Sequence, residues 1–321
     1  MMATPEDFKR IVERHKRFAW GSTYVPSTLA NRQEAPRIAR ISRLNSRRLG
    51  RTLHALSTPE RVYIQLALHH PNLVDLHEQR MLSPSPTVHP LLGHPLTRGS
   101  LQRPLRGTVE IAAEIGLRHH EVTIETSDGS RLRLPFPYQG DLLLYLMDSN
   151  GIPYALNWTI KDRASAFRER RDGRAKTLAQ QQKDKNHAKL RTQLERDYYA
   201  SAGIRTVQLA LEELDPPVHA NLEMLFAMHS LPLTHELSLL EDFSSEVAQV
   251  ASQGAAVAPV AIQYGARWGS RDQFLARIYQ DIWDRRLHVN LHRPLLIDQP
   301  LDMDGGDILH TYAGIFQEHG E

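Results

Sequence analysis

Asp141 and Lys161 are the two charged residues that bracket the stretch Gly140 to Asp162, which predicts two neighbouring strands. Hard divalent cations favour oxygen ligands, so the Asp141 carboxylate and the backbone carbonyl of Ile160 are candidates to hold Mg²⁺. An ammonium at Lys161 could orient or help to deprotonate a water beside a phosphate. The alternative is that Asp141 belongs to a turn and Lys161 is a solvated strand end. Spacing alone does not choose between these readings, because such pairs are common by chance.

Two runs of residues predict the strands that would position this pair. The first run, residues 142–147, is apolar throughout and suits a central strand buried on both faces. The second run alternates, and since the side-chain period of a strand is two, Asn157, Thr159 and Lys161 share one face. This face places a polar row ending in a lysine beside the carboxylate of Asp141.

Glu60 is a third candidate and lies near the predicted start of a helix. The start signal is Ser57-Thr58-Pro59-Glu60, and the helix continues to Pro71 with apolar residues at helical spacing. Ser57-x-x-Glu60 is also a capping box, in which the glutamate returns to the N-cap amide. Capping is therefore the structural alternative to a chemical role for Glu60.

Composition excludes several kinds of site. The chain has 321 residues, which suggests two or three structural units. It has no cysteine, which excludes disulfides, thiolate zinc sites and cysteine nucleophiles and fits a cytoplasmic protein. No apolar run is long enough to predict a membrane span, and the charged N-terminus differs from a signal peptide.

A net charge of +2 conceals two basic segments. The first runs from Arg32 to Arg51 with Glu34 as its one acidic residue, and the second runs from Arg163 to Arg191. Basic segments separated from acidic ones indicate a polyanionic partner, because neutralised phosphates release counterions. Solvated helices and loops are the alternative.

The remaining segments predict a mixed α/β layer followed by a smaller unit. A helix at 4–18 precedes a loop at 21–35 and an arginine-rich connector at 37–51. The elements that follow are a short strand or extended turn at 72–79, a helix at 108–116, a hairpin at 120–125 and 131–134, a helix through Leu190, Leu194 and Tyr198, and a strand at 204–209. We divide the chain into an N-terminal helix and connector (1–56), the α/β domain (57–210) and a C-terminal domain (211–321).

The C-terminal domain is predicted to be winged-helix-like. An amphipathic helix spans residues 270–285, and the segment LHVNLHRPLLID that follows alternates before Pro294. A helix leading into a small hairpin is the outline of such a unit, which serves protein docking or DNA binding.

Three short segments, taken together, resemble a known family. They are Gly50-Arg51 through Leu56-Ser57-Thr58-Pro59-Glu60, then Val74-Asp75-Leu76-His77-Glu78-Gln79, then Asn157-Trp158-Thr159-Ile160-Lys161. In this order they resemble the TnsA endonuclease subunit of heteromeric cut-and-paste transposases, whose core is similar to that of type II restriction enzymes. The resemblance covers residues 45–290 and is weakest in 81–106.

The resemblance implies a restriction-endonuclease-like fold of the PD-(D/E)xK type, a mixed sheet flanked by helices. It also implies that Glu60, Asp141 and Lys161 form the active site. Glu60, Asp141 and the Ile160 carbonyl would hold Mg²⁺, with Mn²⁺ accepted. A helix N-terminus is a position from which Glu60 can both cap and reach a cation.

One position departs from the family pattern. Such nucleases usually carry Glu or Gln two residues before the lysine, where this chain has Thr159. Either Asn157 on the same face substitutes for it, or the metal relies on Glu60, Asp141 and the Ile160 carbonyl. The number of metal ions stays open on this reasoning.

The activity implied is metal-dependent hydrolysis of a phosphodiester at transposon ends, on the strand that a partner recombinase does not cut. The implied partners are DNA, a TnsB-type transposase and a TnsC-type ATPase regulator, in the bacterial cytoplasm. The side chains expected to contact the DNA backbone are those of Arg43, Arg47, Arg48, Arg51 and Arg163. A nuclease fold that has lost activity and serves as a DNA-binding or assembly module is the main alternative, and a stand-alone restriction or repair nuclease is a third.

Overall fold

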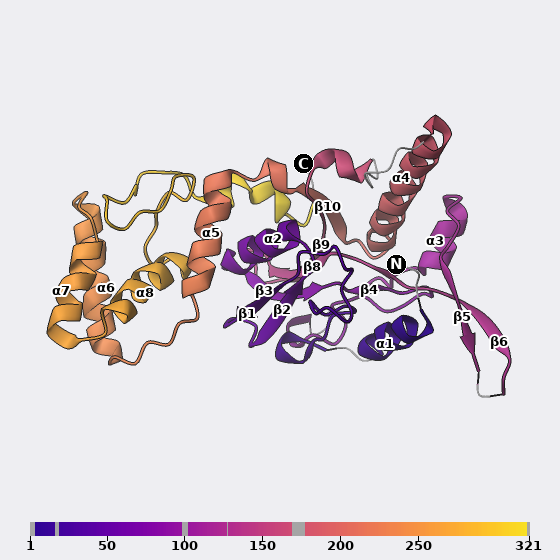
Figure 1. Ribbon diagram of the computed structural model, residues 1–321, viewed down its shortest axis with the longest axis horizontal. Coiled ribbons are helices and arrows are strands. Elements are labelled where there is room, and N and C mark those ends of the chain that lie inside the picture. Colours follow the sequence, from indigo (N-terminus) through magenta and orange to yellow (C-terminus); the bar gives the residue numbers. More distant parts are fainter. Residues whose placement is uncertain (1–3, 17–18, 98–101, 127, 169–176, 320–321) are drawn as a thin grey trace.

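Four strands form the central sheet of the protein. The computed structural model describes residues 4–16, 19–97, 102–126, 128–168 and 177–319 (Figure 1). The strand order is β10-β9-β8-β3, with bounds Leu73–Glu78 for β3, Leu142–Met147 for β8, Pro153–Lys161 for β9 and Arg205–Ala210 for β10. β10 runs parallel to β9, whereas β9 with β8 and β8 with β3 are antiparallel. All four predicted strands are confirmed.

β8 lies inside the sheet because its residues are apolar on both faces. Its leucines at alternate positions pack with helix α2 (Thr58–His69) in one hydrophobic cluster. Leu143 and Tyr145, which point the other way, pack with helix α4 (Leu178–Ala200) in a second cluster. No side chain from residue 142 to residue 146 is more than 1% exposed. Helices therefore cover both faces of a mixed sheet, as predicted for the fold class.

The segments between β3 and β8 form smaller elements at the edge of this core. The helix predicted at 108–116 is confirmed as α3 (Thr108–Glu114), and it packs beside α4. The predicted hairpin is confirmed as β5 (Glu121–Glu125) and β6 (Arg131–Pro135), and it extends away from the central sheet (Figure 1). A short second sheet pairs β4 (Met81–Leu82) with β7 (Tyr138–Gln139).

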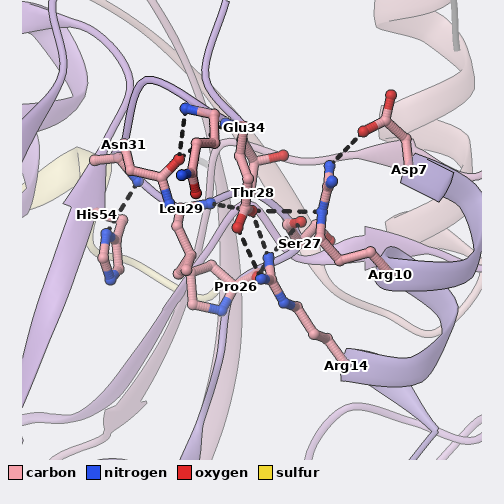
Figure 2. Close-up of polar contacts among 12 residues, drawn as sticks. Asp7, Arg10, Arg14, Pro26, Ser27, Thr28, Leu29, Asn31, Glu34 and His54 are labelled. Carbon is pink, nitrogen blue, oxygen red and sulfur yellow. Dashed lines mark hydrogen bonds and ion pairs between the residues drawn. The ribbon is translucent and has the colours of Figure 1, made fainter. Parts of the chain in front are cut away.

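Helix α1 (Pro5–His15) is held by the loop that follows it. Figure 2 shows Glu34 at the centre of these contacts, with its carboxylate oxygens 2.7 and 2.9 Å from the Arg14 guanidinium nitrogens. The same carboxylate accepts the Leu29 N–H at 3.0 Å. Burial raises the pKa of Glu34, but the bonds to Arg14 and Leu29 outweigh burial and leave that pKa at about 2. The positive charge of Arg14 is thus balanced within the protein.

The arginine-rich segment predicted as a connector instead forms a hairpin. Its strands are β1 (Ser42–Ser46) and β2 (Arg51–Ala55). Leu44 and Leu53 face each other across the pair and are at most 3% exposed. Gly50 closes the turn with a φ of 62°, which glycine adopts at little steric cost. The connector prediction is wrong because every second residue at the end of each strand is buried, Leu44 and Ser46 in β1 and Leu53 and Ala55 in β2, which is a strand pattern.

Helices dominate the C-terminal part of the chain. They are α5 (Pro216–Met228), α6 (Leu237–Ser252), α7 (Ala258–Trp268), α8 (Arg271–Trp283) and the short α9 (Ile308–Thr311). The predicted amphipathic helix is confirmed as α8. One continuous hydrophobic cluster joins the α2 side of the sheet to these helices through α5. Figure 1 shows α6, α7 and α8 grouped on the side of α5 away from the sheet.

The hairpin predicted after α8 does not form. Among the described residues after β10, none belongs to a strand, and the segment 287–297 is loop. Its backbone is bonded by one buried side chain, because the Asn221 amide donates to the carbonyls of Leu291 and Arg293 and accepts the Leu295 N–H. A side chain of α5 thus replaces the strand partner. The described residues therefore do not support a winged-helix-like unit.

Short 3₁₀ helices complete the secondary structure. They span Gly21–Thr23, Pro95–Thr97, Ala164–Phe167, Leu211–Glu213 and Ala313–Ile315. Within the ranges that the structure describes, no helix has the length and apolar character needed to cross a membrane.

Candidate active site

Asp141, Ile160 and Lys161 meet at one end of the central sheet. Because β8 and β9 are antiparallel, with Leu142 opposite Trp158, the start of β8 lies beside the end of β9. The Asp141 Oδ2 accepts the Ile160 N–H at 2.7 Å and lies 3.3 Å from the Lys161 Nζ. The same Nζ donates to the Ile160 carbonyl at 2.9 Å. The structure therefore joins the acid and the lysine directly.

Glu60 reaches this end of the sheet from the first turn of α2. Its Oε2 accepts the Leu56 N–H and the Gln79 Nε2–H, each at 2.9 Å, and its Oε1 accepts the Ser57 hydroxyl at 2.7 Å. The predicted return to the N-cap amide is replaced by the bond to Leu56, one residue earlier. Glu60 thus stabilises the start of α2 and also lies beside the other candidate residues.

Gln79 connects Glu60 to Asp141, and the sequence analysis did not select it as a site residue. Its side chain binds Glu60, while its backbone N–H donates to the Asp141 carbonyl at 3.0 Å. Its φ of 42° lies in the left-handed region, which is uncommon for a residue other than glycine. The available signal was a polar residue directly after the end of β3, a position that antiparallel pairing places beside the start of β8.

Burial and the charge of Asp141 oppose the ionisation of Glu60. Burial raises the pKa of Glu60 to about 7, with the negative charge of Asp141 as the next cause. Asp141 in turn raises the pKa of Lys161 above its ordinary value. At neutral pH, Lys161 is therefore a cation, and Glu60 is poised between its two protonation states.

The raised pKa of Glu60 predicts that this group costs stability as the pH rises. The folded protein keeps the proton up to about pH 7, whereas the unfolded chain releases it near pH 4.5. That difference corresponds to roughly 3 kcal/mol, lost progressively between these two pH values. We expect Glu60→Gln to remove this loss, because an amide in the same place can accept from Leu56 and Gln79 and donate to Ser57.

Urea unfolding of the protein and of Glu60→Gln at pH 5 and pH 8 measures this effect. The variant should gain stability relative to the native chain at pH 8. If the difference between the two free energies of unfolding is the same at both pH values, Glu60 does not titrate as described.

A third carboxylate, which the sequence analysis missed, meets the polar face of β9 from helix α4. Glu195 of α4 is 5% exposed and accepts bonds from Thr159 Oγ1 at 2.8 Å and Asn157 Nδ2 at 3.1 Å. Arg191 lies 3.3 Å from its other oxygen. The negative charge of Asp141 is the main cause that raises the pKa of Lys161 against the opposing effect of burial, and the charge of Glu195 raises it further. A glutamate inside an otherwise polar, basic helix gave no periodic signal that marked it.

The donor atoms at the site suit a hard cation. Two carboxylates and the Ile160 carbonyl are oxygen ligands of the kind that Mg²⁺ takes together with several waters. Asp141 uses Oδ2 for its bonds within the protein, and its Oδ1 accepts no bond from any described residue. A cation between Glu60 and Asp141 would also relieve their mutual repulsion. Within the described ranges, no group of three or more His, Cys, Asp and Glu side chains could hold a metal, so these two carboxylates would need waters and the carbonyl.

Three of the five arginines expected to contact DNA are bonded within the protein. Arg51 is 5% exposed and lies 2.8 Å from both carboxylate oxygens of Glu78. Arg48 donates to backbone carbonyls around the end of α2, including that of His70 at 2.7 Å. Arg47 forms a two-bond ion pair with Asp284 at 2.7 and 2.9 Å. These side chains connect the β1–β2 hairpin to its neighbours.

The other two arginines, Arg43 and Arg163, are exposed and form no ion pair with a described acidic residue. Arg43 donates its Nε–H to the Ala30 carbonyl at 3.2 Å. Four further basic residues of the second segment lie outside the described residues, namely Arg170, Arg171, Arg174 and Lys176.

Comparison with known proteins does not decide between an active nuclease, an inactive DNA-binding or assembly module, and a stand-alone restriction or repair nuclease. No protein-family model and no curated protein matches the chain. The functional assignment therefore depends on the site itself.

Proposed function

We propose that the chain is a Mg²⁺-dependent DNA endonuclease subunit of the TnsA type, with a restriction-endonuclease-like fold, that hydrolyses the non-transferred strand at transposon ends. The observation that carries this proposal is the meeting of Glu60, Asp141 and Lys161 at one end of the sheet. Two mutually repelling carboxylates beside an ammonium form the charge pattern expected where a cation and a phosphate come together. The family resemblance supplies the transposon end as substrate.

Each side chain has a separate task in this proposal. The carboxylates of Glu60 and Asp141 and the carbonyl of Ile160 would hold the ion, which when bound supplies Lewis-acid activation of water and phosphate. Lys161 keeps its proton on Nζ at neutral pH, because Asp141 raises its pKa. It therefore orients water by donating a hydrogen bond and offsets negative charge on the phosphoryl oxygens, and it does not act as the proton acceptor.

Glu195 serves as a positioning residue for this site. It fixes Thr159 on β9, two residues before Lys161, and its negative charge helps to keep the lysine protonated. We expect Glu195→Gln to lower the cleavage rate about tenfold while DNA affinity changes little, since a lost charge contact of this kind is worth about 1 to 2 kcal/mol.

Single-turnover cleavage and DNA binding, measured separately, test the role of Glu195. Arg191→Gln is the matched control, because it removes the ion pair on α4 but leaves the carboxylate and its bonds to Thr159 and Asn157. Equal losses of rate in both variants would show that the ion pair, and not the charge near Lys161, matters.

Contacts to the DNA backbone are assigned to exposed cations. Arg163 follows Lys161 by two residues and is exposed, so it lies close to the proposed scissile phosphate. Arg43 is the second exposed candidate. Phosphate contacts of this kind position the duplex without reading its sequence, so their loss should weaken binding to all sequences alike. The TnsB-type transposase and TnsC-type ATPase remain the proposed partners, with the helices α5 to α8 as the docking part for the regulator.

The decisive assay is nicking of labelled transposon-end DNA by the full chain, with and without the partner transposase and regulator. Cleavage that requires Mg²⁺ or Mn²⁺, stops with a chelator and maps to the non-transferred strand supports the proposal. Cleavage of DNA lacking these ends, without partners, would instead indicate a restriction or repair nuclease.

A second function, that of an inactive DNA-binding or assembly module, is favoured by one observation. Thr159 stands where these nucleases usually have Glu or Gln, and its hydroxyl is already bonded to Glu195. Absence of nicking with all partners and both metals present, together with retained DNA binding, would support this function.

A further inference from the structure

Arg80 lines a cavity that is separate from the candidate active site. It follows Gln79 in the chain, but Gln79 bonds to Glu60, whereas Arg80 faces a cavity of about 140 Å³. The cavity lies between α1, β4 and the last turns of α4. Its described lining contains three basic residues besides histidine and no aspartate or glutamate.

The two basic residues from the α1 side are balanced by acids. Arg14 is held by Glu34, whose carboxylate oxygens lie 2.7 and 2.9 Å from its guanidinium nitrogens. Figure 2 draws this pair. Lys16 forms an ion pair with Glu13. Burial is the main cause that lowers the pKa of His15 to about 3, so this third side chain is neutral at physiological pH. The unbalanced charge of the cavity is therefore that of Arg80.

Arg80 has no carboxylate partner in the described part of the chain. Its Nη1 donates to His77 Nδ1 at 2.9 Å, and no other described side chain or carbonyl accepts from its guanidinium. On the other side of the His77 ring, the Asp75 carboxylate lies 3.3 Å from His77 Nε2. A neutral ring thus separates the two charges. A guanidinium has five N–H donors, so most of the N–H groups of Arg80 are left to face the cavity.

Tyrosine hydroxyls add further donors on the α4 side of the cavity. The Tyr198 hydroxyl oxygen accepts the Ser83 N–H at 3.1 Å, which leaves its own hydrogen to donate. The Tyr199 hydroxyl has no hydrogen-bond partner among the described residues, although Tyr199 is only 1% exposed. Thr87 contributes another hydroxyl to the lining. A cation with hydroxyl donors on several sides matches the tetrahedral oxygens of a phosphate group.

Desolvation supplies the energetic reason for a ligand. A half-buried cation is costly unless a counter-charge accompanies it, and although nearby tyrosines leave the pKa of Arg80 raised, burial is the largest single influence and opposes its charge. The volume is several times the roughly 30 Å³ that one water occupies in the liquid, so a small oxyanion and a few waters fit.

We propose that this cavity binds a phosphate group, with the Arg80 guanidinium as counter-ion and the Tyr198 and Tyr199 hydroxyls as donors. The phosphate is either inorganic phosphate or the terminal 5′-phosphate of a nucleotide strand. The site does not depend on the proposed nuclease function, since it shares no side chain with Glu60, Asp141 and Lys161.

Isothermal titration calorimetry of the full chain at constant ionic strength, without divalent metal, tests the site. Inorganic phosphate should bind saturably above a chloride background, and Arg80→Gln should weaken binding about tenfold or more. Tyr199→Phe removes only the unbonded hydroxyl and should weaken binding several-fold. If Arg80→Gln does not fold, the phosphate affinity of Tyr199→Phe alone tests the proposed site.

Arg196→Gln is the matched control, because Arg196 lies on α4 but is exposed, with a side chain 63% accessible. Equal weakening by Arg196→Gln and Tyr199→Phe, or no saturable binding of phosphate, overturns the proposal. A short oligonucleotide with a 5′-phosphate, compared with the same strand ending in a 5′-hydroxyl, identifies the source. Preference for the phosphorylated strand supports a strand end, and binding of inorganic phosphate alone supports the free ion.

Discussion

Asp141→Asn abolishes metal-dependent cleavage, with an expected loss of about a thousandfold or more in rate. The carboxylate has three tasks, and two of them depend on its negative charge. It pairs with Lys161 at 3.3 Å, it accepts the Ile160 N–H at 2.7 Å, and it offers Oδ1 to a cation. An asparagine can keep the bond to Ile160, but it loses the charge that holds the lysine and the ion.

The control for this prediction is Asp162→Asn. Asp162 is the neighbouring acid on the same strand end, but it is exposed, and its bond to Glu212 uses the backbone carbonyl. Cleavage of transposon-end DNA should survive in this variant. Both variants should show the circular dichroism of the native chain. Cleavage that persists in Asp141→Asn would remove Asp141 from the mechanism and leave the assembly module as the better function.

Arg51→Met lowers the free energy of unfolding by about 3 to 5 kcal/mol, the cost typical of leaving one charge of a buried pair without its partner. Glu78 is fully buried, and its carboxylate binds Arg51 through both oxygens and also accepts the His54 N–H at 3.0 Å. Methionine fills much of the space of arginine but leaves this carboxylate without a cation. The β1–β2 hairpin should loosen from β3 as a result.

Arg47→Met is the matched control for this second prediction. Arg47 lies in the same hairpin and also forms a two-bond pair, with Asp284, but the two side chains are 49% and 31% exposed. Exposed pairs are worth about 1 kcal/mol or less, because water screens them. Urea unfolding of both variants measures the difference. Equal losses would contradict a structural role for Arg51 and return it to the candidates for DNA contact.

The first prediction assigns Asp141 a role in cleavage, and the second assigns Arg51 a role in stability. Arg51 was expected to contact the DNA backbone on the basis of charge density in the sequence, yet its guanidinium is enclosed by Glu78 and the Tyr24 ring. A run of arginines does not reveal which of them meets a buried carboxylate from another strand. Arg47 and Arg48 are also exposed but are bonded to Asp284 and to backbone carbonyls, so Arg43 and Arg163 are the members of the group with the most donors left for a polyanion.

Local patterns determined most of the elements around the site. The apolar run of β8, the alternation of β9 and the start signal of α2 were readable because each depends on residues close in sequence. The turn between β8 and β9 makes them an antiparallel pair, so the placement of Asp141 beside Ile160 and Lys161 also followed from local order.

The tertiary structure alone decided the rest, because those features depend on partners distant in sequence. Glu60 joins the site through Gln79, and Glu195 reaches β9 from a helix whose surface pattern is mostly polar. The predicted C-terminal hairpin failed for the same reason, since the Asn221 side chain supplies the hydrogen bonds that a second strand would have made. Sequence periodicity indicates which face of an element is buried, but a hydrogen bond or ion pair between elements is fixed only when the chain packs.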